Sequence, residues 1–96
     1  MEIKKVFVVG AGLMGGGIAQ VCAQAGIHVT LNDVKEEALE KSLKSIRWSV
    51  GKFIEKGKVQ EDLEQIMSRI ESTVDYERVT EADLVIEGFI FSGPFP

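Results

Sequence analysis

Three glycines at fixed spacing are the residues of this 96-residue chain best suited to hold a ligand. Gly10, Gly12 and Gly15 follow an apolar run and precede a helix-like segment. In that context the first glycine takes a tight turn, the second leaves the backbone open to a phosphate, and the third lets the helix lie close to the strand. The free N–H groups at the start of the helix then face the anion. The spacing predicts a dinucleotide-binding loop.

Two further glycines, Gly16 and Gly17, extend the motif into the first helical turn. Glycine also marks ordinary strand-to-helix turns, so the motif alone is weak support for a nucleotide. Each glycine in a helix costs roughly 1 kcal/mol relative to alanine, however, and a plain structural turn seldom carries two more. We therefore interpret the stretch as a nucleotide-binding loop.

An acid, Asp33, stands 18 positions after Gly15. That spacing suits a carboxylate that binds the adenosine ribose hydroxyls and repels a 2′-phosphate, which favours NAD. Asp33 and Glu36 also have the spacing of a capping box, so Asp33 is alternatively the cap of the next helix. Given the glycine motif we favour the ribose role, while Lys35 leaves NADP open.

A strand, a helix and a second strand must position these residues. We expect strands at 3–9 and 27–31 with a helix at 13–25 between them, and Gly26 as its left-handed cap. After Lys5 the first strand is apolar, as in a central parallel strand covered on both faces. One face of the helix is expected to be apolar, and it comprises Ile18, Val21, Cys22 and Ala25.

A long helix at 35–56 and a shorter one at 61–67 are expected to form a projecting hairpin. The seam of the long helix comprises Leu39, Leu43, Ile46, Val50 and Phe53. Strands at 69–74 and 83–87, with a helical turn at 77–82, complete the prediction. The fold class is α/β, a Rossmann-type parallel sheet in the order 3-2-1-4 with the helical hairpin at 35–67.

The other side of the long helix carries a polar stripe with two interpretations. Three ammonium groups and two hydroxyls can hold the phosphates of an acyl carrier, or they simply form a solvated helix face, the interpretation that spacing alone favours. The stripe consists of Lys41, Ser45, Ser49, Lys52 and Lys56. The neighbouring Trp48 is predicted to be a packing residue.

Composition limits the partners. The net charge of −4 and pI of about 5.0 give no reason to expect nucleic acid or an anionic membrane as a partner. The sequence has no apolar run long enough for a membrane span, and we assign no metal site. The single cysteine, Cys22, is interpreted as a small core residue, which fits a reducing cytoplasm.

Two stretches, Gly10 to Ala19 and Ala82 to Glu87, together with Asp33 and the hairpin, resemble the amino-terminal domain of 3-hydroxyacyl-CoA dehydrogenases, particularly the 3-hydroxybutyryl-CoA type. The resemblance implies NAD-dependent oxidation of a 3-hydroxyacyl-CoA to the 3-ketoacyl-CoA in fatty acid metabolism. It implies that Asp33 binds the adenosine ribose. Cofactor contacts are implied for Gly10, Gly12, Leu13, Met14 and Gly15, and coenzyme A contacts for Ser49, Lys52 and Lys56.

The last residues differ from the pattern of this family. We expect 1–87 to be a partial NAD-binding domain and 88–96 a divergent apolar tail, from a truncated form whose end reflects a shifted reading frame or the way the gene was expressed. His28, the sole histidine, is expected at the surface. The chain alone is then inactive, with no catalytic residue assigned, and the alternative is a dinucleotide-binding or self-associating fragment. An open edge at Leu84 to Glu87 predicts a homodimer.

Overall fold

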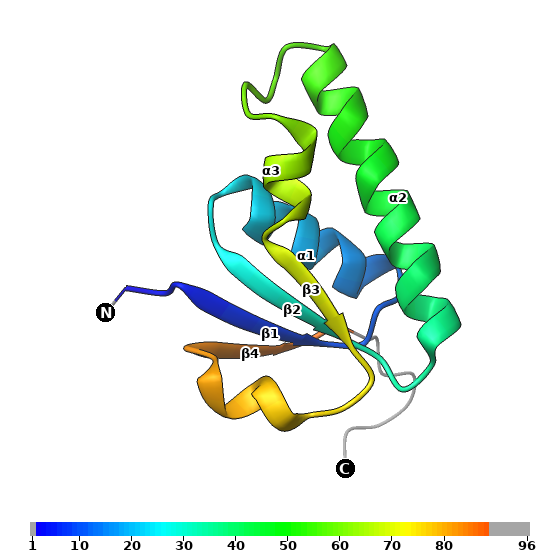
Figure 1. The fold of residues 1–96 in the computed structure, drawn as a ribbon, viewed down its shortest axis with the longest axis vertical. Coiled ribbons are helices and arrows are strands. Elements are labelled where there is room, and N and C mark those ends of the chain that lie inside the picture. The colour runs from blue at the N-terminus through cyan, green and yellow to red at the C-terminus, as the bar shows by residue number, and fades with distance from the viewer. Residues whose placement is uncertain (1, 89–96) are drawn as a thin grey trace, which may run out of the picture.

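A computed structural model describes residues 2–88, where four parallel strands form one sheet in the order β3-β2-β1-β4 (Figure 1). This order and the α/β class confirm the prediction from sequence. The elements are β1 (Lys5–Val9), α1 (Leu13–Gln24), β2 (His28–Asn32), α2 (Glu36–Glu55), α3 (Leu63–Met67), β3 (Ile70–Thr73), the 3₁₀ helix η1 (Glu77–Glu81) and β4 (Leu84–Glu87).

Strand β1 lies between β2 and β4 and is buried on both faces. Val6 and Val8 belong to the cluster that α1 and α2 cover. Phe7 points to the opposite face, since side chains alternate along a strand. There its ring centroid lies 6.2 Å from that of Tyr76, just before η1. The expectation of a central strand covered on both sides is confirmed.

Helix α1 buries only part of the face that was predicted. Ala19 and Ala23 are fully buried, whereas Val21 is 67% exposed and Ala25 is exposed. Ile18 and Cys22 pack at the edge of the core. The helix lies against both the sheet and α2, and the small alanine side chains suit this close approach.

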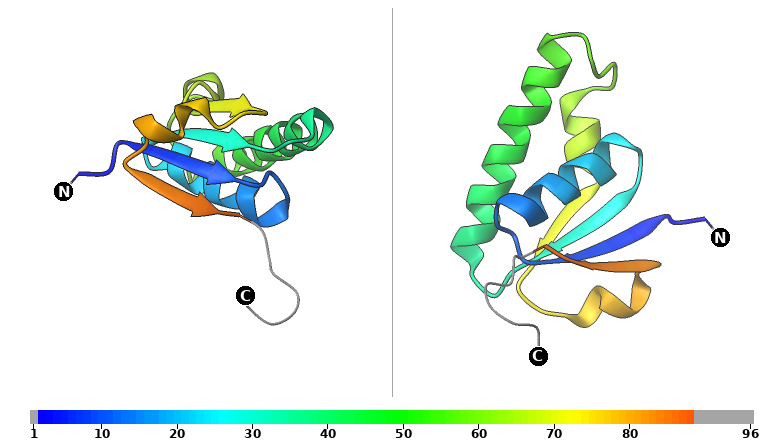
Figure 2. Two further views of the ribbon diagram at one scale, coloured as in Figure 1. Left: turned by 90° about the horizontal axis from the view of Figure 1, so that it is seen from below. Right: turned by 180° about the vertical axis from the view of Figure 1, so that it is seen from behind.

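Helices α2 and α3 form the expected hairpin, and its closed end projects past the sheet (Figure 2). Leu39, Ile46 and Val50 are buried, as the seam predicts. Phe53 is exposed instead, and Ile54 packs against the core in its place. The residue beyond the helix, Gly57, has a φ of +72°, the left-handed conformation that suits glycine.

Among residues 2–88, no helix has both the length and the apolar character needed to cross a bilayer. The expected apolar tail lies outside the described residues from Phe89 onward. Gly88 is described, and its N–H donates to the carbonyl of Val9 over 2.7 Å, continuing the pairing of β1 with β4.

Candidate functional site

The glycine loop lies at the carboxyl end of the sheet, between β1 and α1. Gly10 has a φ of +97°, which side chains rarely adopt. Its N–H donates to the carbonyl of Asn32 at the end of β2, over 2.7 Å. The tight turn expected at the first glycine is therefore present, and it is joined to the neighbouring strand.

Close backbone contact explains why the third position of the motif, Gly15, is a glycine. A Cβ on Gly15 would lie 1.7 Å from the carbonyl oxygen of Gly10. Gly88 approaches from the end of β4, where a Cβ would lie 2.5 Å from the Cα of Gly15. Sequence reasoning did not assign this role to Gly88. The three backbones hold the start of α1 tightly against two strands.

The amino end of α1 has room for an anion. A Cβ at Gly12 would have no neighbour within 4 Å. No side chain caps the helix, and its first turn contains no acid. Leu13 is 97% exposed, and Met14 is also exposed. These uncapped N–H groups without a competing carboxylate fit the pyrophosphate of a dinucleotide.

Asp33 is bonded to the glycine loop. Its Oδ2 accepts from the N–H of Ala11 over 3.0 Å, and its Oδ1 accepts from the N–H of Lys35 over 2.9 Å. These two bonds, that of Ala11 foremost, lower the pKa of the carboxyl below its usual value. The cap position of α2 belongs to Lys35 rather than to Asp33. The capping-box alternative is therefore wrong, and each oxygen keeps a lone pair for a ligand hydroxyl.

The neighbouring Asn32 is a buried residue that the sequence did not single out. Its Nδ2 donates to the carbonyls of Thr73 and Asp75, over 3.2 and 2.8 Å. Asn32 thus fastens the loop after β3 beside the end of β2. Its Oδ1 is buried and has no partner among the described residues.

A groove of about 580 Å³ runs between α1 and α2, beginning at the glycine loop. Its lining includes Gly12, Leu13, Gln20, Lys41, Ser45, Trp48 and Ser49. The Nε2 of Gln20 donates to the Oγ of Ser49 over 2.9 Å. Trp48 is 68% exposed, so its prediction as a packing residue is wrong.

The floor of this groove depends on Gly16. A Cβ there would lie 2.5 Å from the Oγ of Ser42, a buried hydroxyl of α2. Gly17 is different, because a Cβ there would meet nothing within 4 Å. Gly16 therefore allows α1 and α2 to approach each other closely. The only signal of this role in the sequence is that its neighbour Ser42 lies between the seam residues Leu39 and Leu43.

The predicted coenzyme A residues extend along α2 from this groove toward the end of the helix. Ser49 lines it, Lys52 follows one turn later, and Lys56 is the cap residue at the end of the helix. The Nζ of Lys52 lies 5.6 Å from the centroid of the Trp48 ring and 3.4 Å from the Oε2 of Glu55. Both lysines are exposed.

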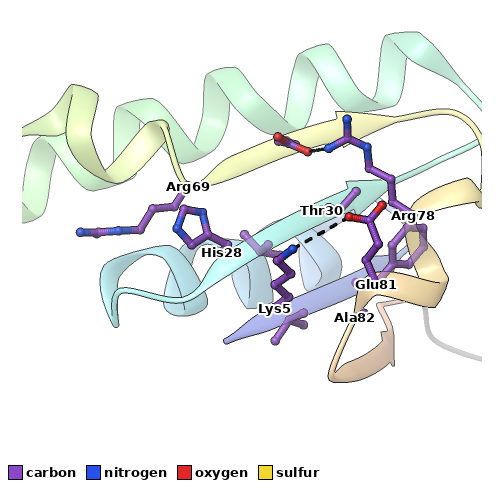
Figure 3. A pocket seen from close by; sticks show the side chains of 11 residues that line it. Lys5, His28, Thr30, Arg69, Arg78, Glu81 and Ala82 are labelled. Atoms are coloured by element: carbon purple, nitrogen blue, oxygen red, sulfur yellow. Dashed lines mark hydrogen bonds and ion pairs between the residues drawn. The ribbon is translucent and has the colours of Figure 1, made fainter. Parts of the chain in front are cut away.

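A second hollow, of about 280 Å³, lies on the opposite face of the sheet near the amino ends of the strands (Figure 3). His28 is exposed there, as predicted, and is at the far end of β2 from the glycine loop. The Lys and Arg cations of this hollow are paired with carboxylates: Lys5 with Glu81 over 3.9 Å, Arg78 with Glu71, and Arg69 with Glu61. Its charges therefore largely compensate one another.

Comparison with known proteins gives a consistent family. The family model described as "3-hydroxyacyl-CoA dehydrogenase, NAD binding domain" matches residues 5–90. A probable 3-hydroxybutyryl-CoA dehydrogenase of Deinococcus radiodurans is 44% identical over 86 residues, which are 90% of this chain and 31% of that protein. One of Bacillus subtilis is 43% identical over 88 residues, 91% of this chain and 31% of that protein.

A solved structure agrees. That of (S)-3-hydroxybutyryl-CoA dehydrogenase from Ralstonia eutropha superposes with a TM-score of 0.87 at 33% identity, covering 96% of this chain and 33% of that one. The chain thus spans about a third of the length of these relatives.

Proposed function

The chain belongs to the family of NAD-binding domains of 3-hydroxyacyl-CoA dehydrogenases, and we propose that it is the NAD-binding portion of an enzyme that oxidises 3-hydroxyacyl-CoA to 3-ketoacyl-CoA in fatty acid metabolism. One observation carries the proposal. The glycine loop and Asp33, which follow different strands, are joined by the bond from Ala11 to Asp33 at the uncapped end of α1. This arrangement offers anion donors and a ribose acceptor side by side.

In this proposal the loop binds the pyrophosphate and Asp33 binds the adenosine ribose. The cofactor contacts are assigned to Gly10, Gly12, Leu13, Met14 and Gly15. The charge of Asp33 disfavours the 2′-phosphate of NADP, so the cofactor is NAD. Bound NAD supplies the acceptor for the hydride, and the side chains of this chain orient it.

Coenzyme A is assigned to the polar stripe of α2, through Ser49, Lys52 and Lys56. The Ser49 hydroxyl already accepts from Gln20, which fixes its position, and its own hydrogen remains for an acceptor on the ligand. The two ammonium groups suit phosphates. Together these groups support the acyl-carrier interpretation of the stripe over the solvated-face interpretation.

We expect this chain alone to bind NAD without oxidising a hydroxyacyl-CoA. Oxidation of the hydroxyl needs a group that takes its proton. The sole histidine, His28, is at the amino end of β2, remote from the loop. There are two alternatives. A dinucleotide-binding module would only hold the dinucleotide, and a self-associating fragment would bind another copy of itself and no ligand.

Assembly and location are further parts of the proposal. Strand β4 is at the edge of the sheet, with Leu84 and Val85 exposed, and an open edge of this kind recruits a second copy. We therefore propose a homodimer. The thiol of Cys22, partly buried and with its pKa raised by that burial, suits a reducing cytoplasm. The division into 1–87 and 88–96 stays a prediction.

Calorimetric titration with NAD and NADP tests the cofactor proposal, with Gly12→Asp as the control that places a carboxylate in the anion site. We expect measurable NAD binding that the control abolishes. Unaltered binding in the control would place the cofactor elsewhere. Formation of NADH from 3-hydroxybutyryl-CoA above the level of the control would overturn the expectation of inactivity, and light scattering distinguishes monomer from dimer.

A further inference from the structure

Trp48 is the only tryptophan of the chain and is mostly exposed. Its helix α2 turns Ile46 and Val50 into the core, and both are buried. The Trp48 ring therefore adds a large flat apolar surface at the rim of the groove between α1 and α2. An aromatic ring that borders a groove is a surface on which another ring can stack.

Polar groups surround this ring. Ser45 and Ser49 line the groove beside it, and the ammonium of Lys52 lies 5.6 Å from its centroid. The bond of Lys52 to Glu55 is long, 3.4 Å, and exposed, so it is weak and leaves the ammonium free to meet an anion. A flat ring beside hydroxyls and a cation matches a purine base that carries phosphates.

The Trp48 ring is too far from the assigned ribose site to stack on the adenine of NAD. Trp48 lies 12 residues along α2 from Glu36, or about 18 Å at the rise of an α-helix. Asp33, where the NAD ribose is assigned, precedes the start of that helix. The groove runs instead from Trp48 to Gly12 and Leu13, next to the loop. It joins a base-stacking surface at one end to the cofactor loop at the other.

We propose that Trp48 is the stacking platform for the adenine base of coenzyme A. The phosphates then lie toward Lys52, and the pantetheine arm follows the groove toward Gly12. This inference rests on the proposed function, because it adds a specificity-determining residue to the coenzyme A site. The charged and hydroxylated rim favours the nucleotide end of the carrier over its acyl chain.

Fluorescence provides a direct test, because the only tryptophan is the residue in question. Titration with coenzyme A, or with adenosine 3′,5′-bisphosphate, quenches the emission of Trp48, whereas pantetheine does not. In calorimetry Trp48→Ala weakens both nucleotide ligands about 5- to 160-fold, the range expected for one base stack. Trp48→Phe retains most of the affinity. Phe53→Ala, a change at an exposed aromatic of the same helix, is the matched control and leaves it unchanged.

The outcomes separate this inference from the proposed function. If Trp48→Ala binds coenzyme A as the wild type does, while Ser49→Ala and Lys52→Ala weaken it, the stacking role is wrong and the coenzyme A site stands. If the wild type binds no coenzyme A at millimolar concentration, both are wrong. If the emission changes with protein concentration alone, Trp48 contacts a second copy instead. Thermal unfolding and NAD affinity, unchanged in Trp48→Ala, establish that the variant is folded.

Discussion

The backbone N–H of Ala11 donates a hydrogen bond to Oδ2 of Asp33, and the atoms are 3.0 Å apart. This bond ties the loop after β1 to the acid after β2. Asp33 therefore has two tasks, since it shapes the loop and it presents a charge. The lowered pKa of its carboxyl keeps that charge at neutral pH.

Asp33→Asn should weaken NAD binding about 10-fold and reduce the preference for NAD over NADP. Asparagine has a single oxygen and no charge, so it loses one acceptor and the repulsion of a 2′-phosphate. The ratio of the two affinities, measured by calorimetry, is its own control against a general loss of folding. Equal affinities of the wild type for NAD and NADP would contradict the assigned role.

Gly12→Ala should lower NAD affinity at least 10-fold while changing the free energy of unfolding by less than about 1 kcal/mol. A Cβ there meets no protein atom within 4 Å, so it obstructs only a ligand. Gly17→Ala is the matched control: its Cβ is equally free, and it should stabilise the helix by about 1 kcal/mol. Calorimetry and thermal unfolding measure the two effects. Unchanged NAD affinity in Gly12→Ala would remove Gly12 from the site.

Gly15→Ala should destabilise the fold by about 3 kcal/mol or more, because its Cβ would overlap the backbone carbonyl of Gly10, which cannot move aside as a side chain would. Urea unfolding measures the change. Gly51→Ala, within α2, has no neighbour in the way and should be neutral or stabilising. A Gly15→Ala variant as stable as the wild type would mean that the loop and β4 are not packed as described.

Gly16→Ala should also destabilise, and Ser42→Ala should relieve most of the effect. The new Cβ lies 2.5 Å from the Oγ of Ser42 but 3.8 Å from its Cβ, so removal of the hydroxyl clears the overlap. A double-mutant cycle by urea unfolding gives the coupling. Additive effects of the two changes would show that they do not touch.

Stability should fall as the pH drops below about 4.5, and Asp83→Asn should flatten this fall. Asp83 accepts from the N–H groups of Lys4 and Lys5, over 2.8 and 3.0 Å, and these bonds lower the pKa of its carboxyl. The stability is present above the pKa of the unfolded chain, about 3.9, and is lost as the pH falls through the lower pKa of the folded state.

Asp62→Asn is the control for this pH dependence, because the Asp62 side chain makes no cap bond to α3. Unfolding midpoints at a series of pH values should give parallel curves for wild type and control. An acid dependence of Asp83→Asn that is as steep as that of the wild type would count against the role of Asp83.

Spacing along the chain was enough to predict the sheet order, the hairpin and the turn at Gly10, because these follow from local patterns and from the handedness of crossover connections. It failed for Val21 and Phe53, since periodicity marks an apolar face but does not show which members meet a neighbour. Ala19 and Ala23 form the close contact because they are small. The capping alternative at Asp33 could not be rejected from spacing, because the carboxyl binds the N–H of Ala11, which lies 22 positions away in the sequence.

The pairing of β1 with β4 also determines how late in synthesis β1 can be paired on both sides. The backbone groups on the second edge of β1 are paired only after Asp83 reaches Lys4, which lies 79 positions earlier in the chain. β2 ends at Asn32 and β4 at Glu87. At the usual rates of translation, the interval between their appearance is about 3 to 11 seconds. During that time a nascent chain exposes one unpaired side of an apolar strand, which makes it a substrate for chaperones until Glu87 has left the ribosome.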